Sequence, residues 1–366
     1  MLDMNTFPVV HPYAIEPSAH LAVDELQRVL HTHAHQTSAF RVGLAVLVAL
    51  RRISCSQRVP PSALILGSPI VISATTCDVS QDSDVFPGEY EGNKVICKRL
   101  RVRTPVGERN TIAEDTWAIH EGLLWFYCQG PGVLSFLGYY IHEEAPSGTA
   151  LYLVSPYQES GTLLEHLKVY KGNSRRISLI RDVVKGLDSL HEKGIIHGDI
   201  RGCNIFINEA GHALIGGFGC ACLSSDRPIS VSRYPGPPGS FIGSIPYQPP
   251  EHLDALRNDK FVFPSASADI YSLACLMYEM YTGLSPFHEI SPRRLPSIRA
   301  CHIMEAIATD RSRIPLKPDE QDLAYHENGL TSEIWALMEE SWDRDAQRRP
   351  SARAIGGHPL FTDISD

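Results

Sequence analysis

The segment His197-Gly-Asp-Ile-Arg-Gly-Cys-Asn204 decides the fold, because it gathers imidazole, carboxylate, guanidinium and amide groups within one short loop. Other distinctive segments lie on both sides of it in the chain. They are, in order, Val95-Ile-Cys-Lys98, Glu121 shortly before Trp125, Gly217-Phe-Gly219, Pro249-Pro-Glu251, Asp269-Ile-Tyr-Ser-Leu-Ala-Cys275, Trp342 and Arg349-Pro350. Each is a weak signal alone, and together they lie within about residues 66–358.

The pattern of apolar residues and turn residues changes near residue 160. Before that point, short β-branched runs surround one helical stretch, 110–128; the runs are Ile65–Ile72, Val85–Tyr90, Lys94–Arg103, Val133–Ile141 and Ala150–Val154. After it the periodicity is helical, over 161–170, 176–192, 266–282, 297–308 and 331–342. Strands followed by helices predict an α+β fold with two lobes.

These patterns also divide the chain into segments. Two helical stretches, 19–31 and 38–54, precede Pro60-Pro61, so we expect a partly helical N-terminal extension over 1–62. The main domain is expected over 63–358, with a small β-rich lobe at 63–155 and a large helical lobe at 156–358. Residues 359–366 are expected to form a tail.

Composition excludes several classes of partner. Lys plus Arg number 33 and Asp plus Glu 42, for a net charge of −9, which argues against general binding to nucleic acid. The longest apolar run, Val42–Leu50, is far shorter than the roughly 20 residues of a spanning helix, and no export signal is present at the start. The nine cysteines lack zinc-finger spacing and read as free thiols. We therefore expect a cytoplasmic protein without nucleic-acid or membrane partners.

The ordered motifs resemble those of a protein kinase domain. The catalytic-loop segment matches His-x-Asp-x-x-x-x-Asn, and the segments at 95–98, 217–219 and 249–251 match the Val-x-x-Lys, Asp-Phe-Gly and Ala-Pro-Glu positions. Ser155-Pro-Tyr157, His197-Gly-Asp199 and Ser341-Trp342 are similar to the tyrosine-kinase-like (TKL) group, especially the expanded families of mushroom-forming (basidiomycete) fungi. The resemblance implies a two-lobed protein-kinase-like fold.

The resemblance also implies catalytic roles. Lys98 would hold the α- and β-phosphates of ATP, with Glu121 fixing its ammonium group. Asp199 would orient the substrate hydroxyl and accept its proton, and Arg201 stands where kinases usually have lysine. Asn204 would hold one metal ion.

A second set of residues would bind the adenine ring. Val85 stands where a valine follows the glycine-rich loop, and Phe206 would form the apolar floor. Pro156 would offer its carbonyl group and Gln158 its backbone N–H, since this recognition uses the main chain. Glu251 with Arg349, and Asp269, are expected to be buried structural groups.

Two departures from the kinase pattern affect the phosphate site. Gly217 replaces the aspartate that would bridge Mg²⁺ to the phosphates, a loss worth about 10²–10⁴ in rate. The three glycine positions of the phosphate loop hold Asp78, Ser80 and Ser83. With Asp82 and Asp84, Asp78 is expected to repel phosphate, by roughly 2–3 kcal/mol for each like-charge pair.

The sequence therefore leaves two functions open. One is a pseudokinase or strongly impaired kinase that serves as a signalling scaffold or allosteric binding module, with weak binding of ATP and Mg²⁺. The other is an active ATP-dependent protein kinase, of Ser/Thr rather than Tyr type because Gly243-Ser-Ile-Pro-Tyr247 resembles Gly-Thr-x-x-Tyr. Protein partners or substrates are expected in both cases, and the sequence predicts no oligomeric state.

Overall fold

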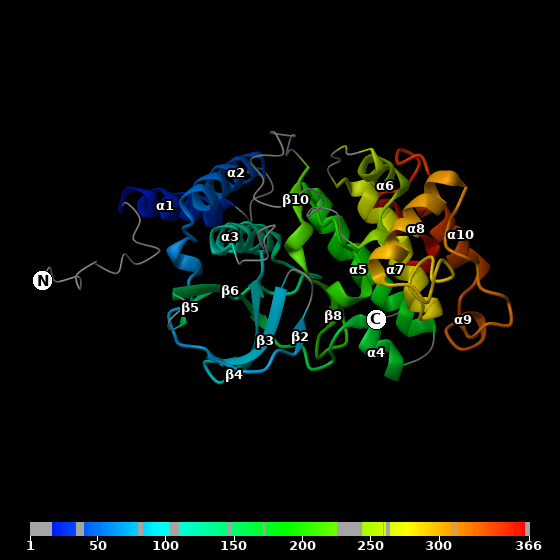
Figure 1. Ribbon diagram of the computed structural model, residues 1–366, viewed down its shortest axis with the longest axis horizontal. Helices are drawn as coiled ribbons and strands as arrows, with labels where there is room; N and C mark the ends of the chain where they lie inside the picture. Colours follow the sequence, from blue (N-terminus) through cyan, green and yellow to red (C-terminus); the bar gives the residue numbers. More distant parts are fainter. Residues whose placement is uncertain are drawn as a thin grey trace, which may run out of the picture. The chain divides into compact units, whose positions relative to one another are not determined.

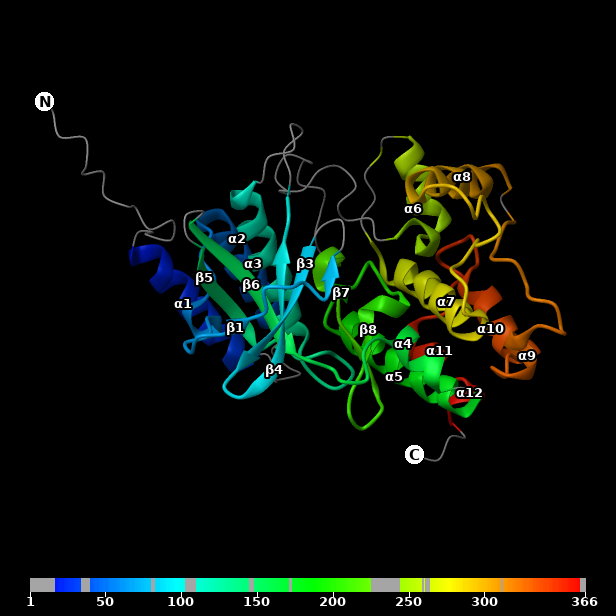
Figure 2. The ribbon, with the colours of Figure 1, turned by 60° about the horizontal axis from the view of Figure 1, so that its bottom comes forward.

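The computed structural model divides the chain into two compact units (Figures 1 and 2). The first unit comprises residues 1–127 and 135–157, and the second comprises 128–134 and 158–366. The described residues are 17–33, 40–79, 83–102, 110–144, 148–170, 173–224, 244–258, 260, 264–310 and 312–362.

The first unit is built on a six-stranded antiparallel sheet. Its strands are β1 (Val71–Ile72), β2 (Asp78–Val79), β3 (Ser83–Tyr90), β4 (Asn93–Leu100), β5 (Gly138–Glu144) and β6 (Gly148–Pro156). The order is β1-β3-β4-β6-β5, and β2 also pairs with β3. Pro87 accounts for the break between β1 and β2: its carbonyl accepts from Ser73 N–H, but proline has no N–H to continue the ladder.

The two faces of this sheet are covered differently. One face carries a buried apolar cluster formed by Ile70, Val95, Cys97, Ala150, Tyr152 and Val154. Because side chains alternate along a strand, Lys98 and its neighbour Val85 lie on the other face. Tyr139 also lies there, and its hydroxyl donates to the Ile119 carbonyl of α3 (Thr111–Cys128) at 2.8 Å.

Two further helices, α1 (Pro17–His33) and α2 (Phe40–Gln57), complete the first unit. Each is amphipathic and buries one stripe: Val23, Gln27 and Leu30 on α1; Gly43, Leu47, Leu50 and Ser54 on α2. Figure 1 shows α3 between the sheet and α2.

The second unit is mainly helical. Its helices are α4 (Leu163–Val169), α5 (Asn173–Glu192), α6 (Pro250–Arg257), α7 (Ala266–Thr282), α8 (Pro296–Thr309), α9 (Leu323–His326), α10 (Ser332–Ser341), α11 (Ala352–Gly356) and α12 (Pro359–Thr362). The central helix is α7, in which every residue from Ala268 to Tyr281 is buried. Two short antiparallel pairs join β7 (Ile195–Ile196) to β10 (Cys222–Leu223), and β8 (Ile205–Ile207) to β9 (Ala213–Ile215).

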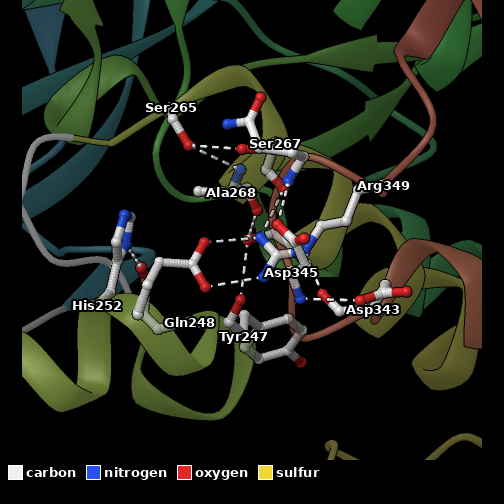
Figure 3. A network of polar contacts seen from close by, with 12 residues as sticks. Tyr247, Gln248, His252, Ser265, Ser267, Ala268, Asp343, Asp345 and Arg349 are labelled. Carbon is white, nitrogen blue, oxygen red and sulfur yellow. Dashed lines mark hydrogen bonds and ion pairs between the residues drawn. The ribbon is translucent and has the colours of Figure 1, made fainter.

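A polar network ties α6 and α7 to the chain before α11 (Figure 3). Arg349 donates to both carboxylate oxygens of Glu251, at 2.7 and 2.8 Å, and to the carbonyls of Asp343 and Ser267. The Arg349 side chain is fully buried, whereas 31% of the Glu251 side chain is exposed. The predicted structural pair is therefore present, with only its arginine fully buried.

The α+β, two-lobed architecture expected from the sequence is confirmed, and so are the long helices. The strand expected at 65–72 is mostly wrong: Ile65 forms one isolated bridge with Tyr139, and only Val71–Ile72 is a strand. The strand expected at 133–141 begins only at Gly138. Short strands β7 to β10 were not predicted, because two or three residues carry no measurable alternation. No described helix is long and apolar enough to cross a membrane.

Candidate functional site

In the first unit, Lys98 and Glu121 form an ion pair. The Lys98 ammonium group donates to Glu121 Oε1 at 2.7 Å, from the middle of the sheet to the middle of α3. Glu121 is 2% exposed, and its Oε2 atom has no hydrogen-bond partner among the described residues. Val85 lies opposite Lys98 in the β3–β4 ladder, so the structure brings these three predicted residues together.

The structure corrects the expectation that three carboxylates face the phosphate site. Asp78 pairs with Val85 and therefore shares the sheet face of Lys98. Asp84 follows the opposite alternation and lies 3.3 Å from the Arg101 guanidinium, which neutralises it. The expected repulsion from Asp84 is therefore wrong. Ser80 and Asp82 lie outside the described residues.

The predicted adenine-binding residues lie in both units. Pro156 ends β6, opposite Val95, in the first unit. Gln158 and Phe206 belong to the second unit, where Gln158 accepts from Gly161 N–H through its carbonyl. The Phe206 ring on β8 lies close to Gly216, since a Cβ atom there would be 2.8 Å from the ring.

The catalytic-loop segment is fixed by the start of α7. The N–H groups of His197 and Gly198 donate to the two carboxylate oxygens of Asp269, at 2.9 and 2.8 Å, and His191 contacts Asp269 at 2.9 Å. Burial alone would raise the pKa of Asp269, but the His191 hydrogen bond and the electrostatic interaction with His191 and His197 outweigh it and lower that pKa. Asp269 therefore stays ionised and holds the loop in place.

Gly198 is required by this loop conformation. Its φ angle is +79°, in the region that favours glycine, and an added Cβ atom would lie 2.7 Å from the Cys220 carbonyl oxygen. The arginine usual at this kinase position would not fit without moving the chain. The His-Gly-Asp sequence is therefore a packing requirement here.

The carboxylate of Asp199 is held by three donors in the second unit. Arg201 Nε and Asn204 Nδ2 donate to its Oδ2 at 3.2 and 2.8 Å, and Asn204 Nδ2 also reaches the Asp199 carbonyl at 2.8 Å. The backbone N–H of Ser244 donates to its Oδ1 at 3.0 Å. Both carboxylate oxygens thus already accept hydrogen bonds, and Asp199, Arg201 and Asn204 lie together as the sequence predicts.

Gly217 lies against this group of residues. Its φ and ψ angles are 77° and 52°, which is left-handed backbone. A Cβ atom at this position would lie 2.5 Å from both Cγ and Oδ1 of Asn204. The Asn204 amide therefore fills the space in which an aspartate side chain would begin.

Sequence reasoning missed two groups beneath the catalytic loop. The Ser244 contact to Asp199 joins residues 45 positions apart, and no local pattern indicates it. Glu279 on α7 accepts from the Gly202 N–H at 3.1 Å and is 8% exposed. Burial raises the pKa of Glu279 in spite of hydrogen bonds from Tyr247 and Gly202. A glutamate in the mostly apolar second half of α7 was the available signal.

Comparison with known proteins identifies the family of the chain. A model of the protein kinase domain matches residues 89–361 of the chain. The chain is 29% identical over 190 residues to mitogen-activated protein kinase kinase kinase 4 of Mus musculus, covering 51% of this chain and 11% of that protein. It is 28% identical to mitogen-activated protein kinase kinase kinase 17 of Arabidopsis thaliana, covering 64% of this chain and 56% of that protein.

A bacterial relative shows the same similarity. Serine/threonine-protein kinase PknB of Mycobacterium tuberculosis is 30% identical over 208 residues, covering 56% of this chain and 29% of that protein. The chain therefore spans between about a tenth and just over half of the length of these three relatives.

Proposed function

The chain belongs to the protein kinase domain family, and we propose that it is a member with strongly impaired phosphotransfer. In this proposal it acts as a signalling scaffold or allosteric module that binds protein partners. Members of the family generally use ATP and Mg²⁺ and act on proteins, so the proposal concerns what this chain retains of that chemistry.

The observation that carries the proposal is the packing of Asn204 against Gly217. Mg²⁺ is bound mainly by carboxylate oxygens, and Gly217 supplies none. The space that a carboxylate would need holds the Asn204 amide, at 2.5 Å from the position of a Cβ atom. Among the described residues no group of three His, Cys, Asp or Glu side chains could hold a metal ion. The residues present therefore do not fit a Mg²⁺ ion bridged to phosphates, and we derive no step through one.

A second candidate function, an active Ser/Thr protein kinase, has its own support. The Lys98–Glu121 ion pair is formed at 2.7 Å, and Asp199 is oriented by Asn204 and Arg201. The similar proteins from M. tuberculosis and A. thaliana are named as kinases. In this candidate Lys98 would hold phosphate and Asp199 would accept the proton of the substrate hydroxyl, with Val85, Pro156, Gln158 and Phe206 around the adenine.

Several finer assignments belong to the same proposal. We assign the chain to the tyrosine-kinase-like branch, of the fungal type, on Ser155-Pro-Tyr157 and Ser341-Trp342. We place the lobe boundary at 155/156 and treat residues 1–62 as an added extension. We also propose a cytoplasmic location without nucleic-acid or membrane partners, and the acidic composition and the free cysteines support it.

Thermal shift with and without Mg²⁺ separates the two candidate functions. Any ligand that binds only the folded chain raises the melting temperature, by an amount set by its concentration and affinity. For the impaired kinase, ATP should give a small shift that Mg²⁺ leaves unchanged, and Lys98→Ala should remove that shift. A shift of many degrees that requires Mg²⁺, together with phosphate transfer above an Asp199→Ala blank, would instead establish the active enzyme.

A further inference from the structure

Helix α3 has no solvent-facing stripe. Thr111 and Ile112 are its only exposed residues, and every described position from Ala113 to Cys128 is buried or partly buried. A helix that packs only on a sheet leaves its opposite face to water, so a helix with no exposed face is covered on a second side. The sheet covers one side of α3, so another element must cover the second side.

That element is α2. Near the start of α2, Gly43 faces Tyr127 of α3, such that a Cβ atom at position 43 would lie 3.6 Å from the tyrosine hydroxyl. Near the end of α2, the Cys55 thiol donates to the Thr116 carbonyl of α3 at 3.6 Å. The start of α2 thus contacts the end of α3, and the end of α2 contacts the first half of α3. The two helices therefore lie side by side and run antiparallel.

The contact between Cys55 and Thr116 lies next to the residues that hold Glu121. Tyr139 donates to the Ile119 carbonyl and packs against Gly122, where an added Cβ atom would lie 2.5 Å from the tyrosine hydroxyl. Glu121 lies between Ile119 and Gly122 in sequence. Burial raises the pKa of Cys55 to about 12, as expected for a thiol enclosed in this packing.

Helix α1 contacts the segment that connects α2 to the sheet. The Asp24 carboxylate accepts from the backbone N–H and the hydroxyl of Ser62, at 2.8 and 2.6 Å. From there the chain reaches the sheet directly, since Leu66 N–H donates to the Tyr139 carbonyl at 2.8 Å. The two helices therefore form a braced hairpin, here called the N-terminal hairpin (residues 17–33 and 40–57).

We propose that the N-terminal hairpin is a positioning element, which holds α3 against the sheet so that Glu121 meets Lys98. Glu121 is buried with one oxygen unpaired by the described residues, so its single contact to Lys98 does not by itself fix the helix. Packing of α2 along α3 supplies the missing constraint. This inference goes beyond the proposed function, because the ion pair can be measured whether or not phosphate is transferred.

The test measures how readily the Lys98 amine reacts in the full chain. Each variant is pulsed with acetic anhydride and acetylation is read by peptide mass spectrometry, with exposed Lys94 on the same strand as the internal reference. Gly43→Trp forces a large ring against Tyr127 and should raise Lys98 acetylation relative to Lys94 about fivefold, as expected for loss of one ion pair. Gly43→Ala is the matched control and should leave the ratio unchanged, because its Cβ atom fits at ordinary contact distance.

A double-variant cycle separates positioning from general loosening. Glu121→Gln alone should raise the Lys98 ratio, and Gly43→Trp added to it should raise the ratio no further, because the hairpin acts through Glu121. If Gly43→Trp exposes α2 in hydrogen exchange while Lys98 reacts as in Gly43→Ala, the hairpin is a passive cover and the proposal is wrong. If Gly43→Trp unfolds the chain, Leu47→Ala replaces it, because Leu47 is buried on α2, and Leu21→Ala, at an exposed position of α1, becomes the control. Leu47→Ala should then raise the ratio of Lys98 to Lys94 acetylation above that of Leu21→Ala.

Discussion

Restoring the missing carboxylate by Gly217→Asp should not produce an active kinase. The left-handed backbone at φ 77° costs an aspartate about 1 kcal/mol. Its Cβ atom would also meet Asn204 at 2.5 Å, so the asparagine must leave its place. Asn204 would then lose its hydrogen bonds to the Asp199 carboxylate and carbonyl, together worth about 3 kcal/mol.

Gly283→Asp is the matched control for the backbone contribution. Gly283 has a similar φ of +70°, and an added Cβ atom meets nothing within 4 Å. The control should therefore lose only about 1 kcal/mol of unfolding free energy. The difference of about 3 kcal/mol corresponds to a melting temperature roughly 6–12 °C lower for Gly217→Asp than for Gly283→Asp.

Calorimetry and phosphate transfer together check this reasoning. Calorimetry compares the two aspartate variants, and radiolabelled transfer to a generic protein substrate is read against Asp199→Ala. A combined variant with glycine at positions 78, 80 and 83 should transfer more phosphate than Gly217→Asp alone, because defects in one assembly are not additive. The packing argument would be refuted if Gly217→Asp had the same melting temperature as Gly283→Asp and transferred phosphate at about 1–100 per second.

Three further predictions test the scaffold. Arg349→Ala should lower the unfolding free energy by about 1–3 kcal/mol in urea titrations, since the partly exposed Glu251 carboxylate loses its bidentate partner; a wild-type midpoint would show that the pair is not structural. Burial raises the folded pKa of Glu279 above 4.5, so its contribution to stability is present at low pH and is lost as pH rises through that folded pKa. Glu279→Gln should remove this loss, and the same pH dependence of stability in the variant and the wild type would contradict the prediction. Gly122→Ala places a Cβ atom 2.5 Å from the Tyr139 hydroxyl and should cost about 1–3 kcal/mol, measured by the melting temperature; an unchanged melting temperature would exclude tight α3 packing.

The sequence alone determined the features that depend on short stretches of chain. The catalytic loop at 197–204 and the pairing of Arg349 with Glu251 follow from motifs of known order. The long helices follow from apolar periodicity, because a stripe that must be buried sets the period. The Lys98–Glu121 pair was implied by the resemblance to protein kinase domains, and the structure contains it at 2.7 Å.

Tertiary structure decided which atoms fill the space around those residues. Asp84 was expected at the phosphate site, but strand pairing places it on the opposite face of the sheet, beside Arg101. A shift of one residue along a strand is enough to move a side chain from one face to the other. The Asn204 amide occupies the space left by Gly217, and the Ser244 N–H reaches Asp199 from a distant part of the chain. The packing of α2 along α3 is likewise invisible in either helix alone. Such contacts depend on close approach between segments far apart in sequence, and side-chain type at one position does not determine what packs against it.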